Sequence, residues 1–159
     1  MAFDPHHHFH WHLGDGTAVV LRSFTPEDRE ALTEAFRRLS PESSYFRFWT
    51  RFRELNPKFI EELCAPDQVN HVGWVMVHEQ PTDVPGLGGG SFWRLPDDPE
   101  TAEVSFTVGD EFQGQGVGTM VLAVLWEHAL HLGVKRFTGR VLNSNLVMRA
   151  WWGRLVRMR

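Results

Sequence analysis

The chain has 159 residues, of which 42% are hydrophobic and 23% charged, and its formal net charge is −4. These values suit a single globular domain and disfavour a disordered or fibrous protein, while the acidic balance provides no overall basic field for nucleic acid. No apolar run reaches the roughly 20 residues that span a bilayer, and no apolar signal core opens the chain, so we expect a cytoplasmic protein without membrane contact.

Residues 1–16 form a histidine-rich segment that contains His6, His7, His8, His10 and His12. Neutral imidazoles at these spacings can bind a divalent metal. However, the segment lacks a cysteine or carboxylate at the spacing of a structural zinc site, and it ends in Gly14-Asp15-Gly16. We expect a flexible tail with adventitious metal affinity and no functional metal, ahead of one domain at 17–159. A histidine-tail metal protein remains an alternative.

The domain is predicted to begin with a strand, TAVVLRSF, over 17–24, which is rich in β-branched and aromatic residues. Thr25-Pro26-Glu27-Asp28 then indicates a helix start, because it combines a capping hydroxyl, a proline in the first turn and acids near the positive helix end. The helix is expected to run to about Leu39, with an apolar face typical of packing against a core.

A second helical piece is predicted from Ser40, with tyrosine, phenylalanine and tryptophan interleaved with arginines. This mixture fits either nucleic-acid stacking or a helix that buries its rings, and the acidic chain favours packing. Another short helix is predicted from Asn56 to about Cys64. Cys64 is the only cysteine, which excludes an intramolecular disulfide. Its apolar surroundings predict a small buried hydrophobe rather than a catalytic thiol.

Three strands are predicted next, over 70–79, 87–95 and 102–108. The middle strand begins LGGG, and we expect these consecutive glycines to weaken it or form a bulge. The segment 96–101, PDDPET, is predicted to be a polar turn.

A helix is predicted from Gly116 to about Leu132, where Gly133 ends it. A strand over 134–142 and a last helix from Asn145 complete the order β, α, α, β, β, β, α, β, α. No internal repeat or domain boundary interrupts it.

The loop before the predicted 116–132 helix is rich in glycine, with Gly114, Gly116 and Gly118. Residues without a Cβ allow the backbone to curl, so that several N–H groups can point at one anion beside a positive helix end. This is the physical form of a phosphate cradle. The spacing does not fit the dinucleotide fingerprint G-x-G-x-x-G or a nucleoside-triphosphate loop. The remaining alternative is that the glycines merely turn a strand into a helix.

The hexapeptide Gln113-Gly114-Gln115-Gly116-Val117-Gly118 resembles the core signature of the GNAT superfamily of N-acetyltransferases: Gln or Arg, two residues, Gly, one residue, and Gly or Ala. The strand before it, the helix after it and the segment 141–145, VLNSN, followed by Met148, add to the resemblance. The stretch 39–48, LSPESSYFRF, also resembles the bacterial protein-lysine acetyltransferase-like branch. That branch includes GNAT domains joined to acyl-CoA synthetase-like or cyclic-nucleotide-binding modules. Together the resemblance covers about residues 17–159.

The resemblance implies an α/β (α+β) fold: a mixed, mainly antiparallel twisted sheet flanked by helices and splayed at the cofactor strand. It also implies that acetyl-CoA is bound as cosubstrate. The pyrophosphate would contact backbone amides of Gln113, Gly114, Gln115, Gly116, Val117, Gly118 and Thr119. The pantetheine arm would hydrogen-bond along Phe106, Thr107 and Val108, with Asn143 or Asn145 on the other side of the cofactor.

The activity implied by the resemblance is transfer of the acetyl group to a primary amine by direct attack in a ternary complex, with protein lysine slightly favoured over a small-molecule amine. Glu103 matches the position of a glutamate base in this branch. We expect an apolar wall at Phe106 or Phe92 to raise the pKa of Glu103, although an exposed strand glutamate is the alternative. A backbone N–H near Val108 would stabilise the oxyanion of the tetrahedral intermediate.

Two departures from the family pattern concern the C-terminal part. Many members place a tyrosine in the final helix to protonate the leaving thiolate, but here that region has Trp151 and Trp152, and Tyr45 is the only tyrosine. The general acid is therefore unassigned. Because the sequence ends at Arg159, where the family usually continues into further strands, we expect some tendency to form a homodimer. The rival function is a non-catalytic acyl-CoA-binding or interaction module.

Overall fold

In the computed structural model of the chain, residues 3–38 and 57–139 are described, and residues 1–2, 39–56 and 140–159 are not. The described elements are β1 (Phe9–His12), β2 (Ala18–Ser23), the 3₁₀ helix η1 (Pro26–Asp28), α1 (Arg29–Arg37), α3 (Pro57–Cys64), β3 (His71–His78), β4 (Gly88–Leu95), β5 (Asp98–Val108), the 3₁₀ helix η2 (Asp110–Phe112), α4 (Val117–His131) and β6 (Arg136–Thr138). The helical piece predicted from Ser40 and the last helix predicted from Asn145 lie outside the described residues.

The described strands form one six-stranded sheet in the order β1-β2-β3-β4-β5-β6. Neighbouring strands from β1 to β5 run antiparallel, and β6 joins β5 in parallel. The predicted mixed, mainly antiparallel sheet with flanking helices is confirmed. Described pairing between β5 and β6 runs from Thr101 to Glu103 on β5, so the predicted splay further along β5 concerns residues after Gly139 that are not described.

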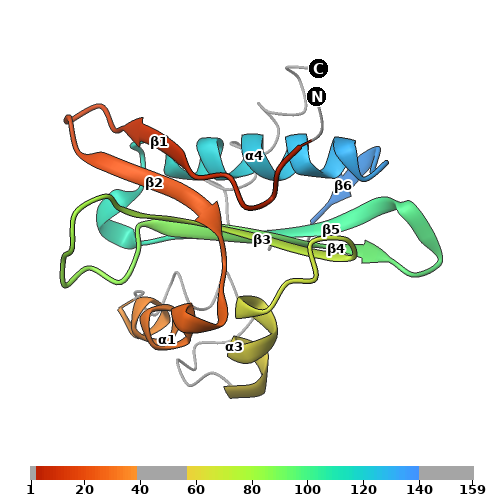
Figure 1. Ribbon diagram of the computed structural model, residues 1–159, viewed down its shortest axis with the longest axis horizontal. Coiled ribbons are helices and arrows are strands. Elements are labelled where there is room, and N and C mark those ends of the chain that lie inside the picture. The colour runs from red at the N-terminus through yellow and green to blue at the C-terminus, as the bar shows by residue number, and fades with distance from the viewer. Residues whose placement is uncertain (1–2, 39–56, 140–159) are drawn as a thin grey trace, which may run out of the picture.

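Helices cover both faces of this sheet, with α4 on one face and α1 and α3 on the other (Figure 1). Under α4 the core includes Trp74, Phe92 and Leu125, which have no exposed surface. On the opposite face a smaller apolar cluster contains Phe24 and Phe36 together with residues of α3. Because successive strand residues point to opposite faces, the central strands β3 and β4 contribute to both clusters.

The N-terminal segment differs from the predicted flexible tail, because Phe9–His12 form β1 and pair with β2 along its whole length. The Phe9 ring lies 5.8 Å from the Trp74 ring, and Phe3 lies 5.8 Å from the same ring. Leu13, which is 5% exposed, belongs to the same core. The apolar residues among the histidines therefore anchor the segment to the sheet by non-local packing.

The three glycines of β4 also differ from the prediction, because they pair regularly with β3 and β5, and the register shift lies between Arg94 and Leu95. A Cβ on Gly89 would lie 2.9 Å from the Trp74 carbonyl oxygen, and one on Gly90 would lie 2.9 Å from the Phe106 ring. These glycines serve close packing on both faces of the sheet rather than a bulge. In addition, β5 begins at Asp98, inside the segment predicted as a turn.

The predicted helix boundaries are confirmed at the described ends. The Asp28 backbone N–H donates to the Thr25 carbonyl oxygen at 2.9 Å, and the Thr25 N–H donates to the Asp28 carboxylate at 2.8 Å. Gly133, with φ of +84°, follows the end of α4. Among residues 3–38 and 57–139, none of the helices has both the length and the apolarity needed to cross a membrane.

Candidate active site

The glycine-rich loop lies between η2 and α4 and reverses the chain into the helix. Gly114 and Gly116 have φ angles of +79° and +89°, which side chains with a Cβ rarely adopt, and Gly116 is the N-cap of α4. A Cβ built at either position would meet nothing within 4 Å. The glycines are therefore required by the backbone turn, and they leave open space in front of the helix start.

Backbone donors gather at this helix start. The Met120 N–H donates to the Gly116 carbonyl oxygen at 3.0 Å and closes the first turn of α4. The N–H groups of Val117, Gly118 and Thr119 precede that bond, at positions that have no partner within a helix. Together with the helix dipole they favour an anion at this position, and binding of a pyrophosphate here stays a prediction.

The loop itself contributes no basic side chain, since 109–119 contain neither lysine nor arginine and do contain Asp110 and Glu111. The Gln113 side-chain amide donates to the Val108 carbonyl oxygen at 3.3 Å, and that of Gln115 donates to the Glu111 carbonyl oxygen at 3.3 Å. Both glutamine side chains therefore brace the loop. Attraction of an anion depends on backbone amides, as the sequence-based interpretation assumed.

The end of β5 leads directly into this loop. The Gly109 N–H donates to the Leu87 carbonyl oxygen at 2.8 Å, toward β4. Because N–H groups alternate in direction along a strand, the Val108 N–H points to the opposite edge, the one that faces β6. This is the orientation that a pantetheine arm or an oxyanion at Val108 requires.

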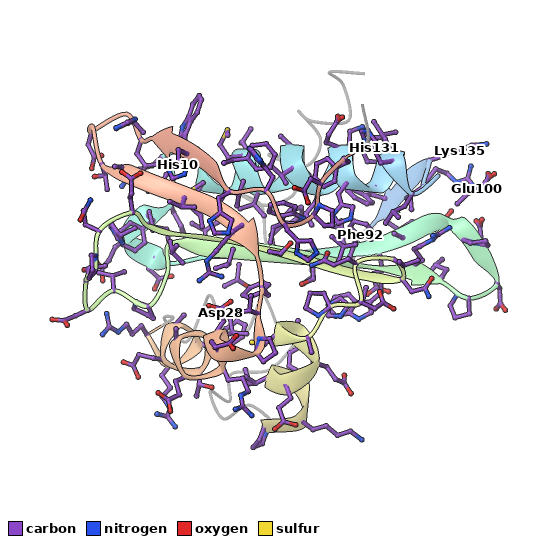
Figure 2. All side chains as sticks on the ribbon, in the orientation of Figure 1. His10, Asp28, Phe92, Glu100, His131 and Lys135 are labelled. Carbon is purple, nitrogen blue, oxygen red and sulfur yellow. The ribbon has the colours of Figure 1, made fainter. Side chains whose placement is uncertain are left out.

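Glu103 is exposed and lies on β5, opposite Trp93 of β4 and Thr138 of β6. Because successive side chains of a strand point to opposite faces of the sheet, Glu103 lies on the face covered by α1 and α3. Phe92 and Phe106 pack into the cluster under α4, on the other face. Phe92 is labelled in Figure 2. The prediction of an apolar wall beside Glu103 is therefore wrong, because the register of β4 and β5 places both phenylalanines on the opposite face of the sheet.

The neighbour of Glu103 on its own face is an aromatic pair. The Trp93 ring stacks on the His71 ring of β3 with centroids 4.4 Å apart and planes 7° apart. Glu103, Trp93 and His71 thus form one row across three strands. Burial lowers the pKa of His71, so its ring is held neutral.

A shallow groove beside this row is lined by Trp93, His71, and the charged residues Lys58, Glu61, Glu62 and Asp67. The Asp67 carboxylate accepts backbone N–H bonds from Val69, Asn70 and His71 at 2.8 to 2.9 Å. Burial alone raises the pKa of Asp67, but these donors outweigh it and the net pKa lies below its ordinary value. The groove therefore carries more negative than positive charge.

A separate cavity of about 100 Å³ lies between α1 and the glycine-rich part of β4. It is lined by Phe24, Leu32, Ala35, Ser91, Ser105 and Thr107, among other described residues. Ser105 and Thr107 share the face of Glu103, whereas Glu103 itself is not in the lining. Asp110–Phe112 also line the cavity, so it reaches the strand-to-loop junction that precedes the cradle.

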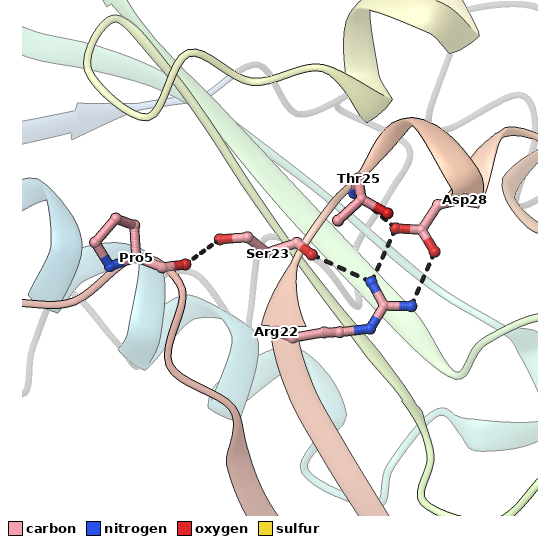
Figure 3. A network of polar contacts seen from close by, with 5 residues as sticks. All are labelled: Pro5, Arg22, Ser23, Thr25 and Asp28. Carbon is pink, nitrogen blue, oxygen red and sulfur yellow. Dashed lines mark hydrogen bonds and ion pairs between the residues drawn. The ribbon is translucent and has the colours of Figure 1, made fainter.

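The helical wall of the cavity is held in place by an ion pair that sequence inspection did not identify. The Arg22 guanidinium donates to both oxygens of the Asp28 carboxylate at 2.9 Å, and to the Ser23 carbonyl oxygen at 3.2 Å (Figure 3). The hydrogen bonds to Asp28 raise the pKa of Arg22. Because Asp28 also caps the first turn at Thr25, this network fixes α1 against β2.

The remaining predictions from the sequence concern two asparagines, the cysteine and the histidines. Asn143 and Asn145 lie outside the described residues. Cys64 has no exposed surface, and burial raises the pKa of its thiol to about 11, which confirms the buried-hydrophobe prediction. His10 pairs with Glu79 at 2.8 Å, and the described histidines, cysteine and carboxylates do not form a group of three that could hold a metal.

The sequence reasoning missed Ser105, Trp93 and His71. The period-two alternation from Glu103 could have identified Ser105 as a residue on the same face. Trp93 and His71 required the pairing register of three strands, which no local signal in the sequence specifies.

Comparison with known proteins supplies independent information. A profile described as the acetyltransferase (GNAT) domain matches residues 18–155. The chain is 35% identical over 140 residues to Acetyltransferase Pat from Mycolicibacterium smegmatis, which covers 88% of this chain and 41% of Pat. The chain therefore spans less than half the length of that relative.

Solved structures show the same fold. The GNAT domain of S. lividans PAT superimposes with a TM-score of 0.82 at 27% identity, covering 92% of this chain and 85% of that one. Diaminobutyrate acetyltransferase EctA from Paenibacillus lautus, solved with its substrate and coenzyme A, has a TM-score of 0.70 at 22% identity, covering 90% and 77%. At that identity the second likeness concerns the fold alone.

Proposed function

Since the chain belongs to the GNAT acetyltransferase family, we propose that it transfers the acetyl group of acetyl-CoA to a primary amine. The observation that carries the proposal is the junction of β5 and α4. There, Gly114 and Gly116 turn the chain with positive φ angles, and the free N–H groups of a helix start follow directly. Pyrophosphate is the ligand that such a cradle suits.

The donor would extend from this cradle along the outer edge of β5. Phe106, Thr107 and Val108 would hydrogen-bond the pantetheine arm, and the Val108 N–H would face the thioester oxygen. An N–H aimed at the oxygen where negative charge develops stabilises the transition state more than the ground state.

The acceptor amine must lose a proton before it attacks. A lysine-like ammonium has an ordinary pKa near 10.4, so only about one in a few thousand is neutral at pH 7. We assign Glu103 as the base, acting directly or through water. Its exposed position gives the proton a route to solvent, and the groove beside it, with Glu61, Glu62 and Asp67, would attract a cationic acceptor.

The reaction then follows one sequence of bonds. The neutral nitrogen attacks the thioester carbonyl carbon, and the carbonyl oxygen carries the negative charge beside the Val108 N–H. The nitrogen gives up its second proton to water, the carbon–sulfur bond breaks as the amide forms, and the coenzyme A thiolate takes a proton from water or from a group outside the described residues. Protein lysine and small-molecule amines both fit this chemistry, and we favour protein lysine because Pat is a 35% identical relative.

The experiment combines binding with turnover. Acetyl-CoA should raise the melting temperature of the parent protein, and a panel of amines and lysine peptides should release thiol. Glu103→Gln should keep the shift in melting temperature and lose most turnover at neutral pH. Glu100→Gln, which removes an exposed carboxylate from the same strand where it pairs with Lys135, is the matched control and should retain turnover.

The rival function is a non-catalytic acyl-CoA-binding or interaction module. Binding of acetyl-CoA with no thiol release for any acceptor would favour it. Equal activity of Glu103→Gln and the parent at every pH would refute the assignment of the base. A homodimer and a cytoplasmic location stay predictions.

A further inference from the structure

The cavity between α1 and β4 is larger than an acetyl group needs. A cavity needs a volume of about 10–15 Å³ to hold one water molecule, which is similar in size to a methyl group. The cavity measures about 100 Å³. It therefore has room for several methylene groups beyond the acetyl methyl.

The chemistry of its wall suits an uncharged chain. Phe24, Leu32, Ala35 and Phe36 present carbon atoms to the cavity. The buried carboxylate of this wall, Asp28, already receives two bonds from Arg22 and one from the Thr25 N–H. At this buried wall an ammonium group would lose its hydration and find Asp28 already neutralised, whereas an alkyl chain would gain by burial. The other charged residues of the lining, Arg38, Asp110 and Glu111, are exposed.

The cavity also lies on the donor side of the proposed reaction centre. Ser105 and Thr107 of β5 line it, and Asp110–Phe112 connect it to the phosphate cradle. Glu103 is not part of this lining and pairs across β4 with Trp93, a residue that lines the acidic groove. A thioester held along β5 would thus lie near an apolar space at Ser105 and Thr107 and, further along the same face of the sheet, near Glu103 and the negatively charged groove.

We infer that this cavity receives the alkyl part of an acyl group longer than acetyl, so that the protein accepts propionyl- and butyryl-CoA as donors. This inference rests on the proposed acyl transfer and specifies its donor. The covalent steps are those of acetyl transfer: the amine nitrogen bonds to the acyl carbon, the carbon–sulfur bond breaks, and the thiolate takes a proton.

Calorimetric titration with CoA, acetyl-CoA, propionyl-CoA and butyryl-CoA tests the inference without requiring an acceptor. Each buried methylene strengthens binding about fourfold, from roughly 0.8 kcal/mol. Butyryl-CoA has two more methylenes than acetyl-CoA and should therefore bind the parent about fifteenfold more tightly.

Variants of α1 locate the effect. Ala35→Leu should fill the cavity and bring the ratio of butyryl-CoA to acetyl-CoA affinity to one or below. Glu30→Leu adds the same side chain at an exposed position of the same helix, outside the cavity, and should keep the fifteenfold ratio. If Ala35→Leu does not fold by circular dichroism, Ala31→Val, a smaller addition to the same lining, replaces it.

The outcomes separate the two proposals. Acetyl-CoA binding with equal or weaker butyryl-CoA binding overturns the acyl-chain inference and leaves the proposed function intact. A fifteenfold ratio that persists in the filled variant overturns the cavity as the site of the acyl chain. Failure of CoA and all its thioesters to bind overturns the cradle, and with it the proposed function.

Discussion

His128 provides a measurable link between a buried polar contact and the pH dependence of stability. Its ring lies in α4, is 3% exposed, and accepts a hydrogen bond at Nδ1 from the Trp74 indole N–H at 3.1 Å. Phe3 lies 4.7 Å from the ring and Phe92 6.2 Å. Burial disfavours the charged form of the ring and lowers the pKa of His128 from 6.5 to about 4. In addition, Nδ1 must stay unprotonated to accept the bond from Trp74.

The direction of this pH dependence follows from how readily the unfolded and the folded protein bind a proton at His128. Below pH 6.5 the unfolded chain binds a proton at this histidine, whereas the folded protein does so only near pH 4. The contribution of His128 to stability is therefore complete above pH 6.5 and is lost as the pH falls toward 4. Its full size is about 3 kcal/mol, since one pKa unit is worth about 1.36 kcal/mol, and about 2 kcal/mol of it is lost between pH 7.5 and pH 5.

Urea denaturation at pH 7.5 and pH 5 measures this loss in the parent, His128→Gln and the control His131→Gln. The parent and the control should each lose about 2 kcal/mol more than His128→Gln does over this range. Burial also lowers the pKa of His71, but that contribution is present in all three proteins and cancels. An equal loss in the parent and in His128→Gln would refute the reasoning.

Two further predictions concern residues outside the proposed chemistry. Asp28→Asn should lower the free energy of unfolding by about 1–3 kcal/mol, because it leaves the half-buried Arg22 guanidinium without its carboxylate. In urea denaturation, adding Arg22→Met should recover part of that loss. No recovery would contradict a penalty from an unpaired charge. Cys64 should resist Ellman's reagent in the folded protein at pH 8, because its thiol is buried. With a pKa of about 11, only about one thiol in a thousand is ionised at this pH. Stoichiometric labelling faster than unfolding would contradict this prediction, because it would show that the thiol is accessible.

Local signals in the sequence predicted the local geometry well. Thr25 and Asp28 form the capping interactions expected of a helix start, and Gly114 and Gly116 adopt the positive φ angles expected of the loop. These features depend on atoms within about four residues of one another. A sequence motif therefore contains nearly all of the information that specifies them.

Predictions that depended on distant residues were less successful. The histidine-rich segment was expected to be flexible, yet Phe9 packs on Trp74 and the strand pairs with β2. The glycines of β4 were expected to form a bulge, yet Gly90 leaves room for the Phe106 ring of the neighbouring strand. In each case the deciding contact is made by a residue that is far away in the chain.

The sequence by itself determined the position of the glycine-rich turn, the helix starts and the family resemblance, because each depends on residue types at short spacing. The tertiary structure decided which side chains share a face with Glu103. A shift of one residue in the pairing of β4 and β5 would exchange the faces of every side chain. The observed register places Trp93 beside Glu103 and Phe92 behind the sheet, so the surroundings of the proposed base are set by strand pairing rather than by neighbouring residues in the chain.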